Sequence, residues 1–509
     1  MESLKGIKRT FSLLLLAIMF SFYQISFSQT NVSGDVWGTW TKANSPYYVT
    51  NNINIPKENT LIINPGVKVN FFGPYRFTIN GLLKANGMDT NKITFCRNGS
   101  AGSWKYIYFS ENAKKGCILD FCIIKDGGLA DSGSVYIFNN DINVTISNCE
   151  IYNSTSFGII IKSSLITSGG DKIIQRCNPT ISNNSIHHHE DGGIYIHAYY
   201  KDTWHDADNN FNTASPLIKN NIIYANGNNG IECYTYANGA IGWDDTNPKI
   251  LTNPTIQQNT FYKNLGNAIY CSKTKEEDFD GTIIIEANPV ICSNIISKSG
   301  VYAINANGQI SVEKVIFNNF WEKSKNIFKG INGDLGSLST TNYNGDSCDV
   351  MSNIFFDPEF WDNLNYDFHL KETSKCINAG GGNCPWDADK SPPDIGAFSF
   401  DPDYIRTSVK DFYYMIPSEF RLFHNYPNPF NPETFISYQV PKASRVMIEV
   451  FNLLGQHIRT LIDEEKSPGS YQILWNGLDD QGQSVSSGVY LYKMKAGDFR
   501  AMKKMVLVR

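Results

Sequence analysis

The sequence predicts an all-β protein in which a long solenoid of short parallel strands is followed by a small β-sandwich. Two observations lead to this fold class. Through the middle of the 509-residue chain, strand-like phrases that begin with Asn or Cys recur at intervals of 25–38 residues, and no helical period accompanies them. From Phe420 onward the recurrence stops, and longer alternating strands separated by turn residues take its place.

The first 28 residues are predicted to be a secretory signal peptide. Basic residues precede an apolar run over residues 11–22, and small residues before Gln29 permit cleavage there. The run is too short for a membrane-spanning helix, which needs about 20 apolar residues. We therefore expect an exported mature chain without a transmembrane segment.

The repeats occupy residues 117–345, and each is predicted to form one turn of the solenoid. Every unit contains three β-rich runs broken by Asn and Gly, as in NSIHHH, GIYIH and PLIKNN. Such strands cannot bury their apolar faces alone, but they can when units stack about 4.8 Å apart with like residues in columns. A column at the turn is expected to form a ladder of side-chain amides and to tolerate left-handed backbone. Its predicted members are Cys122, Cys149, Asn184, Asn221, Asn259, Asn294 and Asn319.

The repeats and their flanks resemble right-handed parallel β-helix proteins of the pectate-lyase-like superfamily. The segment VWGTWTKANSPYYVTNNINIPKENTLIINPGVKVNF is similar to the starting coils of that family, and NIFFDPEFWDNLNYDFHLKETSKCINAG with PPDIGAFSF resembles its closing coils and cap. The resemblance implies a right-handed parallel β-helix over residues 32–400, with first coils over 32–116, repeats over 117–345 and closing coils over 346–400. It implies no particular activity, because the fold hosts lyases, hydrolases, epimerases and adhesins.

Residues 401–419 lack the repeat and are predicted to be a linker, and residues 420–509 are predicted to form a β-sandwich of immunoglobulin-like type. The stretches HNYPNPFNPETFISYQVP, FNLLGQHIRTL and WNGLDDQGQSVSSGVYLYKM are similar to the type A C-terminal sorting domain of the type 9 secretion system. The resemblance implies recognition by that secretion machinery and removal of the domain. Release or attachment at the outer surface of a Gram-negative bacterium would follow.

Five of the eight histidines lie between Asn184 and Asn210. Side chains alternate in direction along a strand, so His187 and His189 could face one ion, whereas three consecutive histidines could not. No third fixed ligand accompanies the pair, and neighbouring coils have turns at the same position. The HHH run is therefore interpreted as a solvated polar turn rather than a metal site.

Four successive units carry an insertion between their second and third strands, and these loops are expected to stack into a wall beside one face of the solenoid. An aromatic residue lies at nearly the same offset in three of the loops and is followed by Asp, or by His and then Asp. Aromatic rings beside carboxylates are typical of sugar-binding surfaces. The predicted ligand-binding residues are Trp204, His205, Trp243 and Phe279, with simple packing of the insertions as the alternative.

The tips of the same loops are acidic, which suits two further roles. Carboxylate oxygens are ligands for Ca²⁺, and Asp206, Asp244 and Asp280 are candidate metal ligands. Inverting hydrolysis of a glycoside uses paired carboxylates about 6.5–9.5 Å apart. Candidate catalytic residues are Asp206, Asp208, Asp244, Asp245 and Asp280.

Composition and motifs leave two function classes. The net charge of −5 gives no basic footprint for nucleic acid, and no P-loop, GxSxG or HExxH motif occurs. Pectate lyases of the resembling superfamily commonly use Arg as the base, but Arg176 is the only arginine between residues 98 and 405. The sequence favours a secreted or cell-surface protein that binds glycans or extracellular matrix along the insertion-lined face. The alternative is a secreted polysaccharide lyase or glycoside hydrolase acting in the same groove.

Export to an oxidising compartment would permit disulfides among the eleven cysteines. Most of them lie among Ile and Val and are predicted to be buried free thiols. Cys233 and Cys271 share one phase of adjacent units and are expected to be neighbouring free thiols in a column. Cys376 and Cys384, in a Gly-rich loop, are the one local pair expected to form a disulfide.

Overall fold

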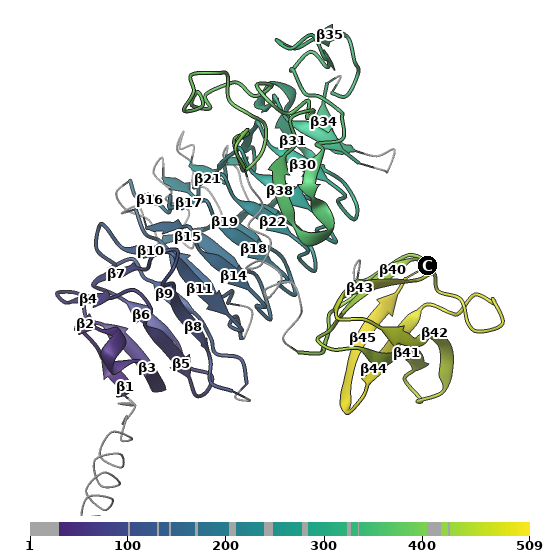
Figure 1. Cartoon of the computed structure of the whole chain (residues 1–509), viewed down its shortest axis with the longest axis horizontal. Coiled ribbons are helices and arrows are strands. Elements are labelled where there is room, and N and C mark those ends of the chain that lie inside the picture. Colours follow the sequence, from purple (N-terminus) through teal and green to yellow (C-terminus); the bar gives the residue numbers. More distant parts are fainter. Residues whose placement is uncertain are drawn as a thin grey trace, which may run out of the picture.

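The computed structural model describes residues 30–99, 102–129, 132–141, 144–167, 172–202, 210–238, 248–276, 283–322, 327–333, 335–404, 419–425 and 428–508. Among these residues the helical elements are three single 3-10 turns, η1 (Lys42–Asn44), η2 (Val312–Lys314) and η3 (Asn363–Asn365). No helix in the described part is long and apolar enough to cross a membrane. The strands form an elongated solenoid and a separate small sandwich (Figure 1), which confirms the predicted all-β class.

Each coil of the repeat contributes three strands, which pair in parallel with the equivalent strands of the neighbouring coils. The strands that follow the ladder turn are β11 (Cys122–Lys125), β14 (Glu150–Tyr152), β18 (Ser185–His187), β22 (Ile222–Tyr224), β26 (Thr260–Tyr262), β30 (Ile295–Ser297) and β33 (Asn319–Trp321). The second strands are β12 (Val135–Phe138), β15 (Ile159–Thr167), β19 (Ile194–Asp202), β23 (Ile231–Asn238), β27 (Ile269–Lys275), β31 (Ile304–Ser311) and β34 (Phe328–Asn332). The third strands, in a sheet of their own, include β10 (Ile118–Asp120), β13 (Thr145–Ser147), β17 (Thr180–Ser182), β21 (Leu217–Lys219), β25 (Thr255–Gln257), β29 (Val290–Cys292) and β32 (Val315–Ile316).

The insertions add a fourth strand to four coils, which the sequence pattern did not reveal. These strands are β16 (Ile174–Arg176), β20 (Phe211–Thr213), β24 (Lys249–Leu251) and β28 (Ile284–Glu286), and they form a parallel sheet. Their pairings are in register from coil to coil. The inserted loops therefore return to the solenoid at equivalent heights on successive coils.

The opening coils use the same parallel arrangement. Strand β3 is nine residues long and pairs with both β5 and β6, so it joins two faces of the coil into one sheet. Trp40 stacks on Tyr47 inside this end, with ring centroids 4.4 Å apart. The strands here are β1 (Thr30–Asp35), β2 (Gly38–Trp40), β3 (Tyr47–Ile55), β4 (Thr60–Ile63), β5 (Lys68–Phe71), β6 (Phe77–Ile79), β7 (Leu82–Asn86), β8 (Ile93–Arg97) and β9 (Ile107–Phe109).

Inward side chains form continuous apolar columns along the solenoid. In the second strands the buried positions Ile137, Ile161, Ile196, Cys233 and Cys271 are in direct register. Burying one Ile side chain completely contributes about 1.5–3 kcal/mol, so each added coil stabilises its neighbours. The two cysteines of this column are adjacent and not bonded to each other.

A second inward column is the predicted asparagine ladder. The Nδ2 of each member donates to the Oδ1 of the next at 2.9–3.0 Å, and the same Oδ1 accepts the backbone N–H of the preceding member. The prediction was wrong by one residue in the last repeat, where Asn318 occupies the ladder instead of Asn319. Left-handed backbone lies at the residue before each member, as at Asn183 and Asn220, and not at the ladder residue. The ladder is Asn184, Asn221, Asn259, Asn294, Asn318 and Asn353.

The segment after the last coil folds back over the solenoid as a cap, with hairpins β35 (Thr340–Thr341) and β36 (Ser347–Cys348), and β37 (Phe360–Asp362) and β38 (Asp367–Leu370). Its apolar side chains bury Tyr224 and Tyr262, which lie on the outward sides of β22 and β26. The predicted Cys376–Cys384 disulfide is wrong. Cys376 accepts a hydrogen bond from Asn319, whereas the Cys384 sulfur lies against β29, 3.4 Å from the Cys292 sulfur.

The C-terminal part is an antiparallel, immunoglobulin-like sandwich with its own core. One sheet contains β39 (Arg421–Leu422), β40 (Thr434–Val440) and β43 (Gly469–Trp475), and the other β41 (Ser444–Asn452), β42 (His457–Lys466), β44 (Gly488–Ala496) and β45 (Phe499–Leu507). Glu190 of the solenoid pairs with Arg421 at 3.3 Å and with Lys503 at 3.4 Å. The sandwich thus contacts the solenoid through a partly buried ion-pair cluster.

Candidate functional site

The residues predicted to bind a ligand or metal lie outside the described residues. This holds for Trp204, His205, Trp243 and Phe279, and for the acidic candidates Asp206, Asp208, Asp244, Asp245 and Asp280. The strands from which three of these loops depart are described. β19, β23 and β27 are in register up to the pair Ala237 and Lys275, so the loops leave the same edge of the sheet.

The outward face of these second strands carries the aromatic surface that leads to the loops. Alternation within each strand buries one set of side chains and leaves the other half-buried on the outside. Because the strands are in parallel register, the outward side chains form three columns along the solenoid. We call them the outward columns: Tyr108, Tyr136, Ile160, Tyr195, Glu232 and Tyr270; Phe138, Lys162, His197, Tyr234 and Ser272; and Ser164, Tyr199, Tyr236 and Thr274.

Rings in the outward columns contact one another from coil to coil. Tyr199 and Tyr236 are stacked, with centroids 5.2 Å apart and planes 6° from parallel. Tyr108 and Tyr136 are 5.4 Å apart and tilted by 56°, so neither ring covers the face of the other completely. The columns therefore present ring edges, partly open ring faces and phenol hydroxyls along several coils.

Crowding of these side chains disfavours their charged forms. Burial raises the pKa of Tyr108 to about 12 and also raises the pKa of Tyr195. Burial, reinforced by the charge of Lys162, lowers the pKa of His197 to about 3, so this imidazole is neutral at physiological pH. Burial lowers the pKa of the Lys162 amine as well, while its Nζ lies 5.3 Å from the ring centre of Tyr199.

Two polar groups in this surface have chemistry that the aromatic rings lack. The Nε2 of His197 is buried between its neighbours and has no hydrogen-bond partner among the described residues. Burial raises the pKa of the Glu232 carboxyl, which accepts a hydrogen bond from Asn229 Nδ2 at 3.0 Å. Hydroxyl, imidazole and carboxyl groups between aromatic rings are a set of partners that suits sugar hydroxyls.

Sequence reasoning missed the outward columns because it concentrated on the insertions. A signal was present in GIYIHAYYK and GIECYTYAN, where the first three alternate residues after the buried Ile are Tyr, His or Glu. Once the strand phase is known, alternation places this set on the outside. The predicted loop residues follow directly after the strands β19, β23 and β27 that carry the outward columns.

The sequence predicted that the three consecutive histidines form a solvated turn, and this prediction is wrong. The three side chains also do not form a shared metal site. His187 is buried in an aromatic stack between Tyr152 and Tyr224, with centroids 5.1 and 4.6 Å away. His189 is fully buried, and its Nδ1 accepts the backbone N–H of Ser154 at 3.1 Å. The prediction failed because both side chains take places in columns that the coil fold buries. No group of three potential metal ligands occurs among the described residues.

His189 belongs to a second polar ladder. In the next coils the equivalent place is held by Asn226 and Asn264, and Asn226 Nδ2 donates a hydrogen bond of 2.8 Å to Asn264 Oδ1. The backbone N–H of His189 donates to Asn226 Oδ1. Its Nε2 lies 3.0 Å from the Ile151 carbonyl, so the neutral tautomer with hydrogen on Nε2 satisfies both ring nitrogens. Burial accordingly lowers the pKa of His189 well below its ordinary value.

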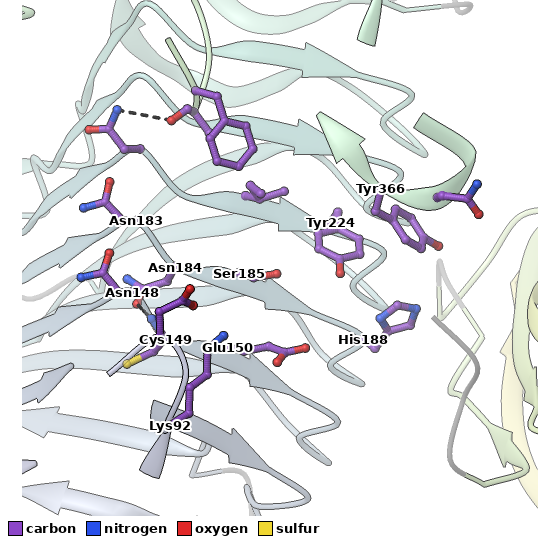
Figure 2. A pocket seen from close by; sticks show the side chains of 16 residues that line it. Lys92, Asn148, Cys149, Glu150, Asn183, Asn184, Ser185, His188, Tyr224 and Tyr366 are labelled. Carbon is purple, nitrogen blue, oxygen red and sulfur yellow. Dashed lines mark hydrogen bonds between the residues drawn. The ribbon is translucent and has the colours of Figure 1, made fainter. Parts of the chain in front are cut away.

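A groove of about 630 Å³ lies on a different side of the solenoid, under the cap. Figure 2 shows Asn148 and Asn183 near one end and Tyr224 with Tyr366 at the other. Its polar groups include the side chain of Glu150, which is 15% exposed. The Tyr224 and Tyr366 rings pack on each other at 4.4 Å, so this aromatic pair is part of the cap contact.

Comparisons with known proteins identify the C-terminal domain type. Residues 433–498 match the family model described as the FlgD Ig-like domain. A comparison with curated protein sequences finds no match.

Three solved structures align with parts of this chain. Pectate lyase Pel9A aligns at 14% identity and TM-score 0.34, over 66% of this chain and 89% of that chain. Dimeric latent PorU from Porphyromonas gingivalis aligns at 16% identity and TM-score 0.16, over 17% of this chain and 9% of PorU. PorZ, a surface component of the type-IX secretion system of the same bacterium, aligns at 19% identity and TM-score 0.14, over 18% of this chain and 12% of PorZ. The aligned region is thus a small part of PorU and PorZ, and at these TM-scores the alignments carry no conclusion about activity.

Proposed function

We propose that this chain is a secreted or cell-surface β-helix protein that binds a polysaccharide or surface glycan along the outward columns. The observation that carries the proposal is the in-register column from β9 to β27, in which tyrosine holds four of the six positions. A surface repeated at the coil spacing of about 4.8 Å suits a ligand that is itself a linear repeat. Tyrosine has a large apolar ring that can stack on the C–H face of a sugar and a hydroxyl that can hydrogen-bond to sugar hydroxyls.

The insertion loops would extend this surface. Trp204, Trp243 and Phe279 belong to loops that leave the edge where Tyr199 and Tyr236 lie. In this proposal their rings, with His205, form the outer wall of the binding surface. Asp206, Asp244 and Asp280 could hold Ca²⁺, which would bridge an acidic glycan to the wall.

A binding assay with matched tyrosine variants tests the proposal. We expect Tyr199→Ala and Tyr236→Ala each to weaken binding about tenfold in a panel of immobilised acidic and neutral polysaccharides, because each removes ring contact and a hydroxyl. Tyr343→Ala is the control, since Tyr343 is 83% exposed on the cap and far in sequence from the columns. Unchanged binding in both column variants, with the fold intact by circular dichroism, would exclude this surface.

A second candidate function is a polysaccharide lyase, and Lys162 favours it. Its lowered pKa increases the share of neutral amine at neutral pH, and a neutral amine can accept the proton next to a uronate carboxylate. Loss of that proton lets the adjacent C–O glycosidic bond break, with the departing oxygen protonated from solvent and a double bond left in the product. A glycoside hydrolase would instead depend on Asp206, Asp208, Asp244, Asp245 or Asp280.

Product analysis separates binding from turnover. A lyase would release products with ultraviolet absorbance from polyuronates in the presence of Ca²⁺, and Lys162→Met would abolish the signal while binding persists. A hydrolase would release reducing ends without that absorbance. Binding without either product supports the non-catalytic function.

We also propose that residues 420–509 serve as the type 9 sorting domain. The support is the motif resemblance together with the separate core of the immunoglobulin-like sandwich. Deleting 420–509 should leave a folded solenoid in the periplasm of a host with this machinery. Normal amounts of the truncated chain at the cell surface would contradict this role.

A further inference from the structure

Two cysteines from distant parts of the chain meet where the cap closes on the solenoid. Cys292 ends β29, and Cys384 lies in the cap loop 92 residues later. Their sulfurs are 3.4 Å apart, and both side chains are buried, with 3% and 7% exposure. This separation is wider than a disulfide bond of about 2.05 Å, yet a small movement of either side chain would close it.

The loop that carries Cys384 is built closely around the Cys292 sulfur. The Cys292 thiol donates to the Gly381 carbonyl at 3.1 Å, and the Gly381 N–H donates to Ser293 Oγ at 3.1 Å. Gly382 has left-handed backbone, and a Cβ there would lie 2.8 Å from the Cys292 sulfur. The glycines therefore let the loop bring Cys384 to this one partner.

Another pair of neighbouring cysteines in the solenoid has a different geometry. Cys233 and Cys271 are in direct register on parallel strands. The backbone ladder holds such strands about 4.8 Å apart, which keeps neighbouring Cβ atoms beyond the usual disulfide separation of about 3.8 Å. Cys384 is in a loop that no strand ladder fixes, so it can approach Cys292 in a way that Cys271 cannot approach Cys233.

We propose that Cys292 and Cys384 form a disulfide in the exported protein and that this bond latches the cap to the solenoid. The oxidant is a disulfide of the class found in thiol oxidases or in oxidised glutathione. One cysteine, as thiolate, attacks that disulfide and forms a mixed disulfide while the other oxidant sulfur leaves as a thiol. The second cysteine then attacks the first, so the oxidant departs fully reduced and has accepted two electrons and two protons overall.

The latch would act on the cap and on the groove beneath it. The bond would close a loop that contains the last two sets of coil strands, β30 to β34, the cap hairpins and Tyr366, which lines the groove. Cross-linking a loop of this length restricts the unfolded chain and favours the docked cap. The disulfide does not depend on glycan binding, so it can be tested independently of the proposed function.

The test uses the full chain, purified reduced and then treated with oxidised glutathione. We expect the mass to fall by two hydrogens, nine of the eleven cysteines to react with a thiol reagent under denaturing, non-reducing conditions, and peptide mapping to join Cys292 to Cys384. Oxidation should also raise the midpoint of thermal unfolding. In Cys384→Ser and Cys384→Ala the mass change and the rise in midpoint should be lost, whereas Cys96→Ser should keep both. Eleven reactive thiols, or a map that joins Cys384 to Cys376, would overturn the proposal.

Discussion

The buried asparagine ladder and the outward columns run along the same coils but obey different constraints. In the ladder every member is Asn, because each amide must satisfy backbone carbonyls of its own coil and of the preceding coil, and the side chain of the next coil. In the outward columns Tyr, Ile, Lys, His, Glu and Ser follow one another although the backbone repeats identically. The coil geometry therefore dictates residue identity in the asparagine ladder and leaves it open in the outward columns. This difference is why the outward columns, and not the ladder, are the place to look for function.

The strongest test of this contrast removes one amide from the middle of the ladder. Asn259 donates to the Ile218 and Gln257 carbonyls and to Asn294, and its oxygen accepts two hydrogen bonds from Asn221. Asn259→Leu leaves several buried groups without partners, at about 1–3 kcal/mol each, so we expect the free energy of unfolding to fall by at least about 3 kcal/mol.

Urea unfolding measures this loss, and Asn305→Leu provides the matched control. Asn305 is a half-buried outward residue of β31, next in its column to Tyr270. We expect its replacement to change the free energy of unfolding by less than about 1 kcal/mol. Equal losses in the two variants would contradict the difference between inside and outside.

A pH series on two histidines sharpens the comparison. Burial lowers the pKa of His189 in the polar ladder and that of His197 in the outward columns, in the latter to about 3. In each case the unfolded chain, with an ordinary pKa of about 6.5, binds the proton more readily than the folded chain. The stabilisation is therefore complete above pH ~6.5 and decreases as the pH falls toward the folded pKa, by at most about 1.4 kcal/mol per pH unit for each histidine.

Replacing each histidine by Asn should remove its share of this acid sensitivity. His189→Asn restores the amide found in the next coils at Asn226, so we expect near-native stability at pH 7 and a gain over the unmodified chain at pH 4 to 5. His197→Asn should show a gain of similar size over this range, because the pKa of His197, about 3, also lies below it. Urea unfolding from pH 7 to 4 measures both. Unchanged acid sensitivity in His189→Asn would contradict the burial of a neutral imidazole in the polar ladder.

The sequence predicted the solenoid because its repeat is a direct consequence of the inward constraints. A ladder that demands Asn at one turn and Ile in the strands leaves a periodic trace in the sequence, as at Asn184, Asn221 and Asn259. The one-residue error at Asn319 arose where two asparagines are adjacent and only the hydrogen bonds single out Asn318. The burial of His187 and His189 was missed because imidazole replaces the usual residue of each column.

Features that depend on contacts distant in sequence were not predictable from the repeat. The partner of Cys384 is decided by how the cap folds back onto β29, which no local spacing encodes. The outward columns leave only a weak alternation, because the fold tolerates many residues there. The predicted loop residues Trp204, Trp243 and Phe279 remain predictions, since they lie outside the described residues.

The smallest effect on stability is expected where the outward face is extended and not disrupted. Thr274 is exposed on β27 and is the next position after Tyr199 and Tyr236 in their column. Thr274→Tyr would add a third ring, and an exposed substitution of this kind should change the free energy of unfolding by less than about 0.5 kcal/mol. One additional aromatic contact is worth about 0.5–1.5 kcal/mol, so glycan binding should tighten about two- to tenfold. Thr341→Tyr, at an exposed position in the cap hairpin, should leave binding unchanged. A loss of stability in Thr274→Tyr as large as that of a ladder substitution would show that the fold also fixes residue identity on the outward face. The tyrosines there would then be explained by stability and not by function.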